Sequence, residues 1–335
     1  MTTLKRWLIT GGCGFIGTNL IKNLVSQGGQ FIRIVDNLSV GTREDLTSVC
    51  QFIEKSGTAI YSSTPTSLGS SSDVELIVGD ILDEKLAMKT AEGIDVMVHL
   101  AASTGVGPSV EHPREDMEVN VIGTFNMLEA ARQRTVKRFV FASSGASLGK
   151  VEPPMHEQLA PHPVSPYGAS KLAGEAYCSA YYRTFGIETI GLRFGNVYGP
   201  GSSHKNSVIA KFIRQAMRGE ILEIYGDGKQ TRDFIYIDDL IQAICLAATR
   251  DGIGGETFQI ASNAETTVSD LVDKLLPILG DSGFNDIEVR QAEPRLGDVR
   301  RNFSDTSKAQ EMLGWQAKVH LSNGLKRTVE WFTNL

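Results

Sequence analysis

The sequence predicts an α/β protein built on a doubly wound parallel sheet, followed by a second and smaller α/β domain. Short β-branched runs alternate with helix-length amphipathic segments along the first 195 residues, which is the pattern of β-α-β units. A glycine-rich turn joins the first expected strand to the first expected helix. After Gly195 the pattern becomes irregular, and a length of 335 residues suits two domains.

The expected strands recur at intervals that leave room for a helical crossover between parallel neighbours. They are Trp7–Thr10, Phe31–Asp36, Glu75–Gly79, Asp95–Leu100, Phe139–Ser143 and Thr189–Phe194. The expected helices between them are Phe15–Gln27, Asp83–Ala91, Arg114–Arg132 and Tyr167–Phe185. The helices expected in the second half are Ser207–Arg218, Asp239–Ala248, Val268–Leu279 and Leu321–Phe332.

The chain is expected to divide into two domains near residue 195. The first comprises residues 1–195, with residues 233–262 returning to it, and the second comprises residues 196–232 and 263–335. The segment Thr47–Asp73 is rich in Ser, Thr and Gly where a short connection would suffice, so it is interpreted as a surface insertion.

Composition excludes several classes of protein. The chain has 33 Lys plus Arg against 39 Asp plus Glu, and a net charge of -6 is a poor match to a nucleic acid or an acidic membrane. No stretch approaches about 18 uninterrupted apolar residues, so no membrane span is expected. The 4 cysteines are scattered and form no C-x-x-C pair or Cys/His cluster, which predicts no metal site and a reducing, cytoplasmic location.

The first candidate site is the segment Thr10-Gly11-Gly12-Cys13-Gly14-Phe15-Ile16-Gly17, where a strand turns into a helix. Such a turn lets the backbone approach a pyrophosphate, and the N–H groups of the following helix favour its negative charge. Asp36 lies at the end of the second expected strand, where a carboxylate accepts the ribose hydroxyls of NAD and repels a 2′-phosphate. We therefore expect NAD rather than NADP, although glycine turns also serve plain packing.

The second candidate site is Tyr167-Gly168-Ala169-Ser170-Lys171 at the start of an expected helix. The four-residue spacing puts Tyr167 and Lys171 on one helical face, so the ammonium group can acidify the phenol, aided by a positive nicotinamide ring. Ser144 follows the preceding strand and can relay a proton from the reacting hydroxyl. A Tyr and a Lys that merely share a surface face are common, but the nucleotide turn and Ser144 favour the catalytic interpretation.

Together these segments resemble the extended short-chain dehydrogenase/reductases, in the NAD-dependent epimerase/dehydratase branch that acts on nucleotide sugars. The resemblance implies a Rossmann-type fold and covers nearly the whole chain. The matching stretches are Thr10–Gly17, Asp36–Leu38, Gly79–Ile81, His99–Ala102, Asn120–Thr124, Tyr167–Lys171, Leu192–Pro200, Gly226–Asp239 and Arg295–Asp298.

The resemblance also implies roles for individual residues. Ser144, Tyr167 and Lys171 would be the catalytic residues. The cofactor would contact Gly11, Gly14, Phe15, Ile16, Gly17, Asp36, Asn37, Asp80, Ile81, Leu100, Ala101, Ala102, Asn120, Tyr167 and Lys171. The substrate would contact Ser144, Tyr167, Asn196, Tyr225, Arg232, Arg295, Asp298 and Asn302, with the two arginines on its diphosphate.

The residues that follow Ser144 indicate which of the family's reactions the chain can catalyse. The 4,6-dehydratases carry an Asp and a Glu after the catalytic Ser or Thr, and decarboxylases carry a Glu at the second position, whereas this chain has Gly145 and Ala146. Among the reactions of the family, oxidation and reduction at a single carbon remains possible. This is the reaction of a UDP-sugar 4-epimerase. Gly107 disfavours a uronate, and Asn302 leaves room beside C2 for an N-acetyl group. Leu148 replaces a usual tyrosine near the sugar.

Three alternatives stay open at this stage. They are an NAD(P)H-dependent keto-sugar reductase or dehydrogenase, a UDP-glucuronate 4-epimerase, and a protein that senses NAD(P) without catalysis. The resemblance further implies a homodimer in which the helices near Arg114–Arg132 and Tyr167–Phe185 pair into four helices.

Overall fold

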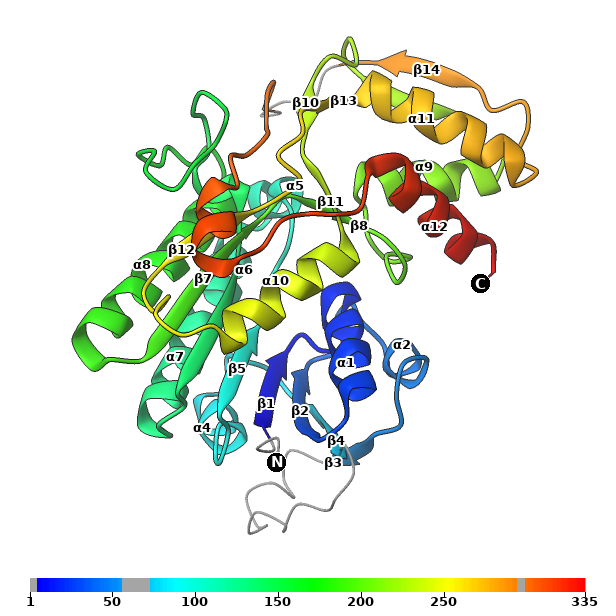
Figure 1. Cartoon of the computed structure of the whole chain (residues 1–335). Helices are drawn as coiled ribbons and strands as arrows, with labels where there is room; N and C mark the ends of the chain where they lie inside the picture. The colour runs from blue at the N-terminus through cyan, green and yellow to red at the C-terminus, as the bar shows by residue number, and fades with distance from the viewer. Residues whose placement is uncertain (1–4, 56–72, 294–298, 335) are drawn as a thin grey trace. The chain divides into compact units, whose positions relative to one another are not determined.

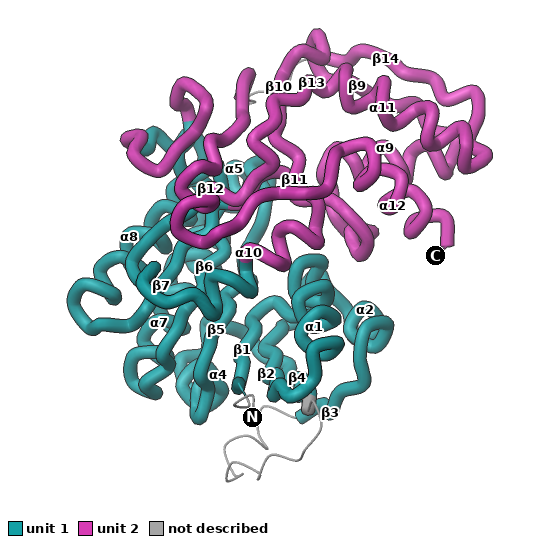
Figure 2. The backbone as a smooth tube through the Cα atoms, in the orientation of Figure 1, with its two compact units in different colours: residues 1–149, 161–193, 244–258 teal, residues 150–160, 194–243, 259–335 magenta. Residues whose placement is uncertain are grey.

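The computed structural model describes residues 5–55, 73–293 and 299–334 of the chain (Figure 1). It divides into two compact units, coloured separately in Figure 2. Unit 1 comprises residues 1–149, 161–193 and 244–258, and unit 2 comprises residues 150–160, 194–243 and 259–335. Residues 150–160 thus belong to unit 2. No feature of the sequence separates this segment from the residues of unit 1 on either side of it.

Unit 1 is built on the parallel sheet that the sequence predicts. The strand order is β12-β7-β6-β5-β1-β2-β4-β3, and β1 pairs in parallel with both β2 and β5. These strands are β1 (Lys5–Thr10), β2 (Gln30–Asp36), β3 (Ile53–Lys55), β4 (Asp73–Val78), β5 (Val96–His99), β6 (Arg138–Ser144), β7 (Glu188–Phe194) and β12 (Thr257–Ile260). The order runs outward in both directions from β1, so the doubly wound fold class is confirmed.

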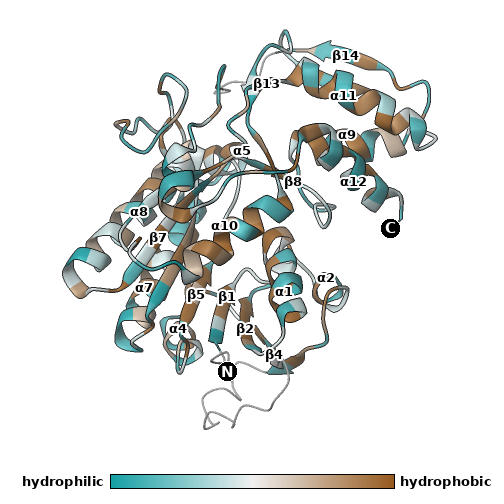
Figure 3. Cartoon of the chain, in the orientation of Figure 1, coloured by the Kyte–Doolittle hydropathy of each residue, from teal (hydrophilic) through white to brown (hydrophobic). Residues whose placement is uncertain are grey.

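The core of unit 1 lies on the strands at the centre of this sheet. Leu8, Ile9, Ile32 and Val98 are fully buried, and the central strands are hydrophobic along most of their length (Figure 3). A parallel sheet that is covered on both faces requires such continuous apolar runs rather than alternation. This is why the short β-branched runs of the sequence correspond to these strands.

The helices of unit 1 are α1 (Phe15–Gln27), α2 (Arg43–Thr47), α4 (Glu84–Thr90), α5 (Val106–Glu111), α6 (Pro113–Met117), α7 (Thr124–Gln133), α8 (Pro166–Phe185) and, across the division with unit 2, α10 (Ile237–Thr249). The bounds of α1, α4 and α8 lie within one residue of those predicted, whereas α2 and α5 were not predicted. The side chain of Ser165 accepts the backbone N–H of Gly168, and Pro166 occupies the first helical position, which fixes where α8 starts.

The predicted helix Arg114–Arg132 is not a uniform α-helix. It consists of α6, a π-helical turn η1 (Glu118–Gly123) and α7. Gly123 at the end of η1 packs against Ile81, because a Cβ at Gly123 would lie 2.5 Å from the Cδ1 atom of Ile81. A π-turn rotates the following residues, and such turns are frequent at functional sites.

The segment interpreted as a surface insertion contributes an edge strand. Ile53–Lys55 forms β3, which pairs in parallel with β4, and Ile53 and Glu54 are exposed. A strand of three residues at the sheet edge carries too few apolar positions for its alternation to be recognised in the sequence. Residues 56–72 lie outside the described residues.

Unit 2 contains short strands and amphipathic helices. Its helices are α9 (Val208–Met217), α11 (Val268–Asp281), the π-helical η3 (Ala309–Leu313) and α12 (Leu321–Thr333). The described residues of unit 2 form three two-stranded sheets, which pair β8 (Asn196–Tyr198) with β11 (Phe234–Tyr236), β10 (Thr231–Arg232) with β13 (Thr266–Thr267), and β9 (Leu222–Tyr225) with β14 (Val289–Ala292).

Candidate active site

The glycine turn of unit 1 is held against the carboxyl ends of β1 and β2. The backbone N–H of Gly11 donates to the carbonyl of Val35 at 2.8 Å, and Gly11 has a φ of 69°, which favours glycine. Gly14 caps α1 and provides no side chain to cover the first N–H groups of the helix. A Cβ at Gly17 would lie 2.6 Å from the Cα atom of Gly12, so α1 packs on the turn only because both are glycine.

Asp36 lies directly beside this turn. Its Oδ2 atom accepts the backbone N–H of Cys13 at 2.9 Å, and its Oδ1 atom accepts that of Leu38 at 2.8 Å. Burial raises the pKa of Asp36, and the two backbone donors oppose the rise. The two backbone donors fix the carboxylate beside the glycine turn. Each carboxylate oxygen retains a lone pair that can accept a further hydrogen bond.

The next two candidate segments line the same carboxyl edge of the sheet. The side chain of Asn37 donates to Asp80 at 3.0 Å, whereas Ile81 is buried against Gly123. The backbone N–H of Ala101 donates to the hydroxyl of Thr10 at 3.2 Å, and a Cβ at Gly11 would lie 2.8 Å from the Ala101 nitrogen. The remaining members of this set, which lie on or beside the same elements, are Phe15, Ile16, Leu100 and Ala102.

Ser144 and Tyr167 are brought together by β6 and the first turn of α8. The hydroxyl of Ser144 accepts the backbone N–H of Ala146 at 3.2 Å, and Ser144 is near enough to Tyr167 to oppose the rise in the tyrosine's pKa that burial causes. A Cβ at Gly168 would collide with the carbonyl of Ala146, so the absence of a side chain lets α8 approach the turn after β6. This close packing aligns the two hydroxyl groups.

Lys171 reaches from α8 to the end of β6. Its Nζ atom donates to the carbonyl of Ala142 at 2.9 Å and lies 5.9 Å from the centre of the Tyr167 ring. Burial lowers the pKa of Lys171 to about 8, and the charges of Asp116 and Glu175 oppose the fall. The ammonium group is thus fixed near the phenol, and it acts on the phenol through space.

The expectation that Lys171 acidifies the phenol is not met in the chain alone. Burial raises the pKa of Tyr167 to about 12, the hydrogen bond with Ser144 opposes the rise, and the charge of Asp116 adds to it. A phenolate at neutral pH therefore needs positive charge beyond what the side chains supply.

Asn120, a candidate for contact with the cofactor, also links neighbouring segments of unit 1. Its side chain is 1% exposed, its Oδ1 atom accepts the N–H of Ser103 at 2.8 Å, and its Nδ2 atom contacts Asp116 at 3.0 Å and Ser170 at 3.2 Å. These partners engage the amide on both ends. Asn120 therefore holds the loop after β5 and α8 in place.

Two buried acids beside the candidate catalytic residues were not identified from the sequence. Asp116 is 1% exposed, and Glu175 is 6% exposed and forms a two-point ion pair with Arg193, at 2.7 and 2.9 Å. Glu175 also accepts the hydroxyls of Ser143 and Ser147, on either side of Ser144. The four-residue spacing between Lys171 and Glu175 is the signal that would have revealed the second acid.

His99 is a packed residue whose ring is hydrogen-bonded at both nitrogens. Its ring nitrogens contact the hydroxyls of Thr10 at 2.7 Å and Thr124 at 3.0 Å. Burial lowers the pKa of His99 to about 3, with a smaller effect from the charge of Lys171. A neutral, fully bonded imidazole of this kind aligns β1, β5 and α7.

Unit 2 carries the candidate substrate residues. Asn196 begins β8, and its backbone N–H donates to the carbonyl of Asp233 at 2.8 Å. Tyr225 ends β9, and the Nζ atom of Lys211 lies 3.4 Å from its hydroxyl and 5.2 Å from the centre of its ring. The sequence did not single out Lys211, whose cation and the tyrosine ring form one recognition surface.

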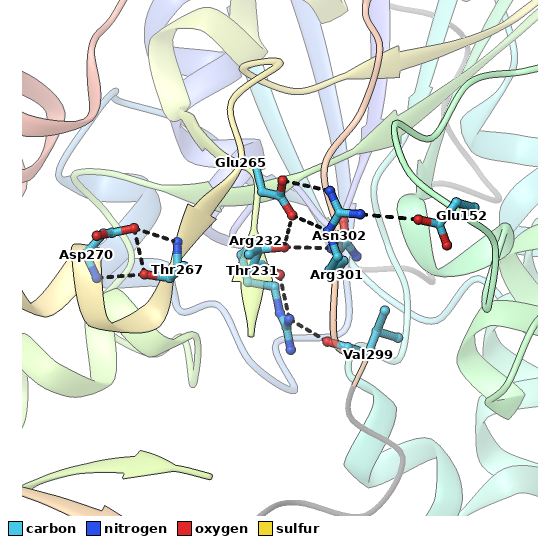
Figure 4. A network of polar contacts seen from close by, with 9 residues as sticks. All are labelled: Glu152, Thr231, Arg232, Glu265, Thr267, Asp270, Val299, Arg301 and Asn302. Carbon is cyan, nitrogen blue, oxygen red and sulfur yellow. Dashed lines mark hydrogen bonds and ion pairs between the residues drawn. The ribbon is translucent and has the colours of Figure 1, made fainter. Parts of the chain in front are cut away.

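Arg232 and Asn302 lie in the polar network of Figure 4. The Nη1 atom of Arg232 donates to the carbonyls of Thr231 at 2.7 Å and Val299 at 2.8 Å, which fixes the guanidinium. The backbone N–H of Asn302 donates to the Thr231 hydroxyl at 3.2 Å, so both candidates attach to one strand pair (Figure 4). Arg295 and Asp298 lie outside the described residues.

Arg301 supports this network from the next position along the chain. It forms a two-point ion pair with Glu265, at 2.8 and 3.0 Å, and contacts Glu152 at 3.2 Å (Figure 4). Such a fork-to-carboxylate pair fixes the backbone on which Asn302 lies. Nothing in the sequence pattern distinguishes Arg301 from its neighbour Arg300, which instead pairs with Asp227.

Two kinds of feature are absent from the described residues, a membrane-spanning helix and a metal-binding cluster. No helix among them is long and apolar enough to span a membrane. Within the same residues, no group of three or more His, Cys, Asp or Glu side chains is arranged to hold a metal ion.

Comparison with known proteins identifies the family. Residues 7–261 match the model of the NAD dependent epimerase/dehydratase family, and the chain belongs to this family. It is 36% identical over 334 residues to the UDP-glucose 4-epimerase of Mycolicibacterium smegmatis, which covers 98% of this chain and 99% of that protein.

Two further comparisons extend this result. A crystal structure of the UDP-glucose 4-epimerase of Thermotoga maritima with UDP-glucose has a TM-score of 0.84 and 34% identity, and covers 98% of this chain and 99% of that one. The dTDP-glucose 4,6-dehydratase of Haemophilus influenzae is 30% identical, with 97% of each chain covered. Epimerases and dehydratases of nucleotide sugars are thus both relatives.

The residues of unit 1 fit the cofactor that the family name implies. The uncovered start of α1 suits a pyrophosphate, and the close contact of Gly11 with Ala101 leaves backbone rather than side chain at the edge. Asp36, oriented by Cys13 and Leu38, suits a ribose with two free hydroxyls. The protein therefore has an NAD-type nucleotide turn.

Proposed function

We propose that this protein is a nucleotide-sugar 4-epimerase, which interconverts the C4 epimers of a UDP-hexose or a UDP-N-acetylhexosamine through a 4-keto intermediate. The observation that carries the proposal is the position of Lys171, whose Nζ atom is fixed on the carbonyl of Ala142 and lies 5.9 Å from the centre of the Tyr167 ring, where α8 packs on the turn after Ser144. The similarity to UDP-glucose 4-epimerases over nearly the whole chain supports it.

The roles of the three residues follow from their chemistry. A bound NAD⁺ would supply the hydride acceptor and donor for C4 of the sugar and a positive charge beside Tyr167. Tyr167 removes the proton of the C4 hydroxyl and later gives it back. Ser144 donates a hydrogen bond to the sugar oxygen, and the ammonium of Lys171 favours the phenolate form of Tyr167.

The turn after Ser144 favours epimerisation over dehydration. Loss of water from a sugar needs an additional acid and base near C5 and C6, and Gly145 and Ala146 supply neither. These residues form the short helical turn η2 (Gly145–Ser147) against the start of α8. The local chemistry is thus limited to moving one hydride and one proton at a single carbon.

Unit 2 supplies the residues that we propose for the nucleotide part of the substrate. Arg232 and Arg295 would bind the diphosphate, Asn196 would donate to it, and Asp298 would accept the ribose hydroxyls. The ring of Tyr225 would pack on the uracil base. The Arg232 guanidinium, held by two carbonyls, is oriented for two-point phosphate binding.

Asn302 and Gly107 guide the proposal for the sugar. An Asn at position 302 leaves more room beside C2 than a Tyr would, which admits an N-acetyl group. Gly107 carries no cation that would bind a uronate carboxylate. We therefore propose neutral hexoses and N-acetylhexosamines as the substrates.

The experiment is turnover without added cofactor. The purified protein is incubated with UDP-glucose, UDP-N-acetylglucosamine or UDP-glucuronate, and the C4 epimer is followed by proton NMR. Because an epimerase regenerates its cofactor in each cycle, we expect many turnovers per protein chain with no NAD added. Conversion that needs stoichiometric NAD(P)H would instead identify a reductase, and loss of water would identify a dehydratase.

We also propose a homodimer formed by α6, η1, α7 and α8. Large apolar side chains are exposed along these helices of unit 1, namely Met117, Ile122, Phe125, Tyr177, Tyr182 and Phe185. Phe125 and Tyr177 pack edge to face at 5.7 Å, so the two helical segments present one continuous surface. A patch of this kind typically marks an interface between proteins.

Sedimentation of two variants tests the dimer. Phe125→Glu introduces a charge into the patch and is expected to give monomers at micromolar concentration. Met217→Glu places the same charge at a similarly exposed apolar residue of α9 in unit 2 and leaves the dimer intact. A monomeric unmodified protein would refute the proposal.

The free thiols of buried Cys13 and Cys178 agree with a proposed cytoplasmic location.

A further inference from the structure

Asp116 is a buried acid that the proposed reaction does not yet use. It lies on α6, which packs against α8, and it is 1% exposed. Its Oδ1 atom accepts the side-chain amide of Asn120 at 3.0 Å. Within the described part of the chain, its Oδ2 atom has no hydrogen-bond partner.

An unpartnered carboxylate oxygen in such a position is costly, because burial removes water without replacing its hydrogen bonds. Natural structures retain groups of this kind where another interaction compensates or where the charge has a function. The compensating charge for Asp116 is the ammonium of Lys171, which is itself buried and donates to the carbonyl of Ala142.

A chain of hydrogen bonds also joins Asp116 to the backbone of Tyr167. Asn120 donates from its Nδ2 atom to Asp116, and the same nitrogen lies 3.2 Å from the hydroxyl of Ser170. The hydroxyl of Ser170 donates in turn to the carbonyl of Tyr167 at 3.0 Å. The π-helical turn that contains Asn120 thus links the acid on α6 to the first turn of α8.

We propose that Asp116 is a positioning residue for the 4-epimerase reaction, whose buried negative charge keeps Lys171 in its ammonium form beside Tyr167. The inference rests on the proposed function, since it assigns a role within the same site. Asp116 acts through Lys171 and Tyr167 and does not itself touch the reacting sugar.

The other charged groups around Lys171 come from three further elements. Glu175 lies one turn later on α8 and is paired with Arg193 of β7, so most of its charge is already balanced. His99 of β5 is neutral near pH 7, because burial and the charge of Lys171 hold its pKa at about 3. Among the described residues, Asp116 of α6 is therefore the negative charge that acts on Lys171 without an ion-pair partner of its own.

The direction of the effect follows from these charges. Asp116 raises the pKa of Lys171 against the effect of burial, and it also raises the pKa of Tyr167. Removing the charge therefore lowers both values. A nearby opposite charge typically shifts a pKa by about one unit or more.

The test compares Asp116→Asn with Glu115→Gln across pH, with kcat measured by epimer formation. Asn has the shape of Asp, and its carbonyl still accepts from Asn120. Glu115 is the exposed neighbour on α6, so its variant removes the same charge from the surface. We expect both limbs of the kcat profile to move down by about one pH unit in Asp116→Asn and to stay in place in Glu115→Gln.

The profile separates an electrostatic role from a structural one. At pH 9, above the pKa of about 8 for Lys171, the expected loss in Asp116→Asn approaches tenfold, whereas at pH 6 the variant equals or exceeds the unmodified protein. A rate that falls by one factor at every pH, with both limbs unmoved, would overturn the proposal.

A second measurement does not depend on activity. The ¹³Cε resonance of Lys171 is assigned by its loss in Lys171→Met, and its titration is followed by NMR in the unmodified protein and in Asp116→Asn. A lower midpoint in Asp116→Asn supports the proposal, and an identical midpoint overturns it. Absence of epimerisation by the unmodified protein would refute the proposed function, and the titration would still decide the role of Asp116.

Discussion

The close packing of α1 on the glycine turn gives a prediction whose size can be worked from distances. In Gly17→Ala the new Cβ would lie 2.6 Å from the Cα atom of Gly12 and 2.7 Å from its carbonyl oxygen, and it would also meet the carbonyl oxygen of Gly11. Ordinary contact begins at 3.4 Å, and 3.4 Å less 2.6 Å leaves a shortfall of about 0.8 Å. All three atoms belong to the backbone, so no side chain can rotate away.

The helix and the turn must therefore separate by most of this distance. Overpacking of this kind costs roughly 1–3 kcal/mol, and the separation carries the N–H groups at the start of α1 away from a bound pyrophosphate. When that cost falls on the bound state, NAD binds about 5- to 150-fold more weakly. The expected result is a folded protein that loses its cofactor during purification.

The assay measures NAD released by heat from a known amount of protein, together with the thermal midpoint. Gly280→Ala is the matched control, because the space beside Gly280 in α11 is open to within 3.8 Å and its backbone is helical. The control should retain its NAD and gain slightly in stability. Full NAD content and unchanged turnover in Gly17→Ala would show that the turn does not hold the dinucleotide.

Three further predictions concern the charged and titrating groups of unit 1. Tyr167→Phe should lower kcat by about 10²–10⁴-fold while NAD content is unchanged, and unaltered turnover would exclude Tyr167 as the base. Glu175→Gln removes the negative charge that balances the buried guanidinium of Arg193, so the free energy of unfolding in urea should fall by roughly 3–5 kcal/mol. The double variant Glu175→Met and Arg193→Met should recover part of this stability. A fall of less than about 1 kcal/mol in Glu175→Gln would contradict this reasoning. The hydrogen bond from Arg132 lowers the pKa of Glu129 from 4.5 to about 2, so this ion pair stabilises the fold above pH 4.5, and the stabilisation is lost as pH falls toward 2. The difference in unfolding free energy between the unmodified protein and Glu129→Gln should therefore be at most about 3 kcal/mol at pH 6 and vanish near pH 2, and a difference independent of pH would refute the linkage.

The sequence predicts what depends on residues close together along the chain. The bounds of α1 agree with the expected helix Phe15–Gln27, because the glycine turn and the apolar spacing that define it are local. Tyr167 and Lys171 likewise lie on one face of α8, where a four-residue spacing requires them to be. Asp36 is beside the glycine turn because both follow strands that pair directly, β1 and β2.

Features made by distant residues are not visible in the same way. Met155 of the segment 150–160 forms an isolated parallel β-bridge with Ser304, and its N–H donates to the carbonyl of Phe303 at 2.8 Å. No local pattern at residues 150–160 anticipates a partner so far along the chain. The π-turn η1 is similar, since its 6 residues are too few for a shift in apolar periodicity to be recognised in the sequence.

Buried charged residues are also difficult to recognise from the sequence. Glu175 follows Lys171 by one helical turn and could have been found by spacing, but its partner Arg193 lies on β7. Asp116 lies on a different helix from Lys171, in a stretch of alternating charges that resembles an exposed surface. Only packing reveals that its neighbour Glu115 is exposed and that Asp116 is buried.

These buried charges bear on when the site can act. With a pKa of about 12, Tyr167 is protonated at neutral pH in the chain alone, although Ser144 opposes the rise that burial causes. The charge of Asp116 raises the pKa of Lys171 and also raises that of Tyr167. A positive charge on a bound ligand would lower the pKa of the phenol. We therefore predict that Tyr167 ionises only when the cofactor is bound, so that NAD binding and proton transfer at Tyr167 fail together in Gly17→Ala.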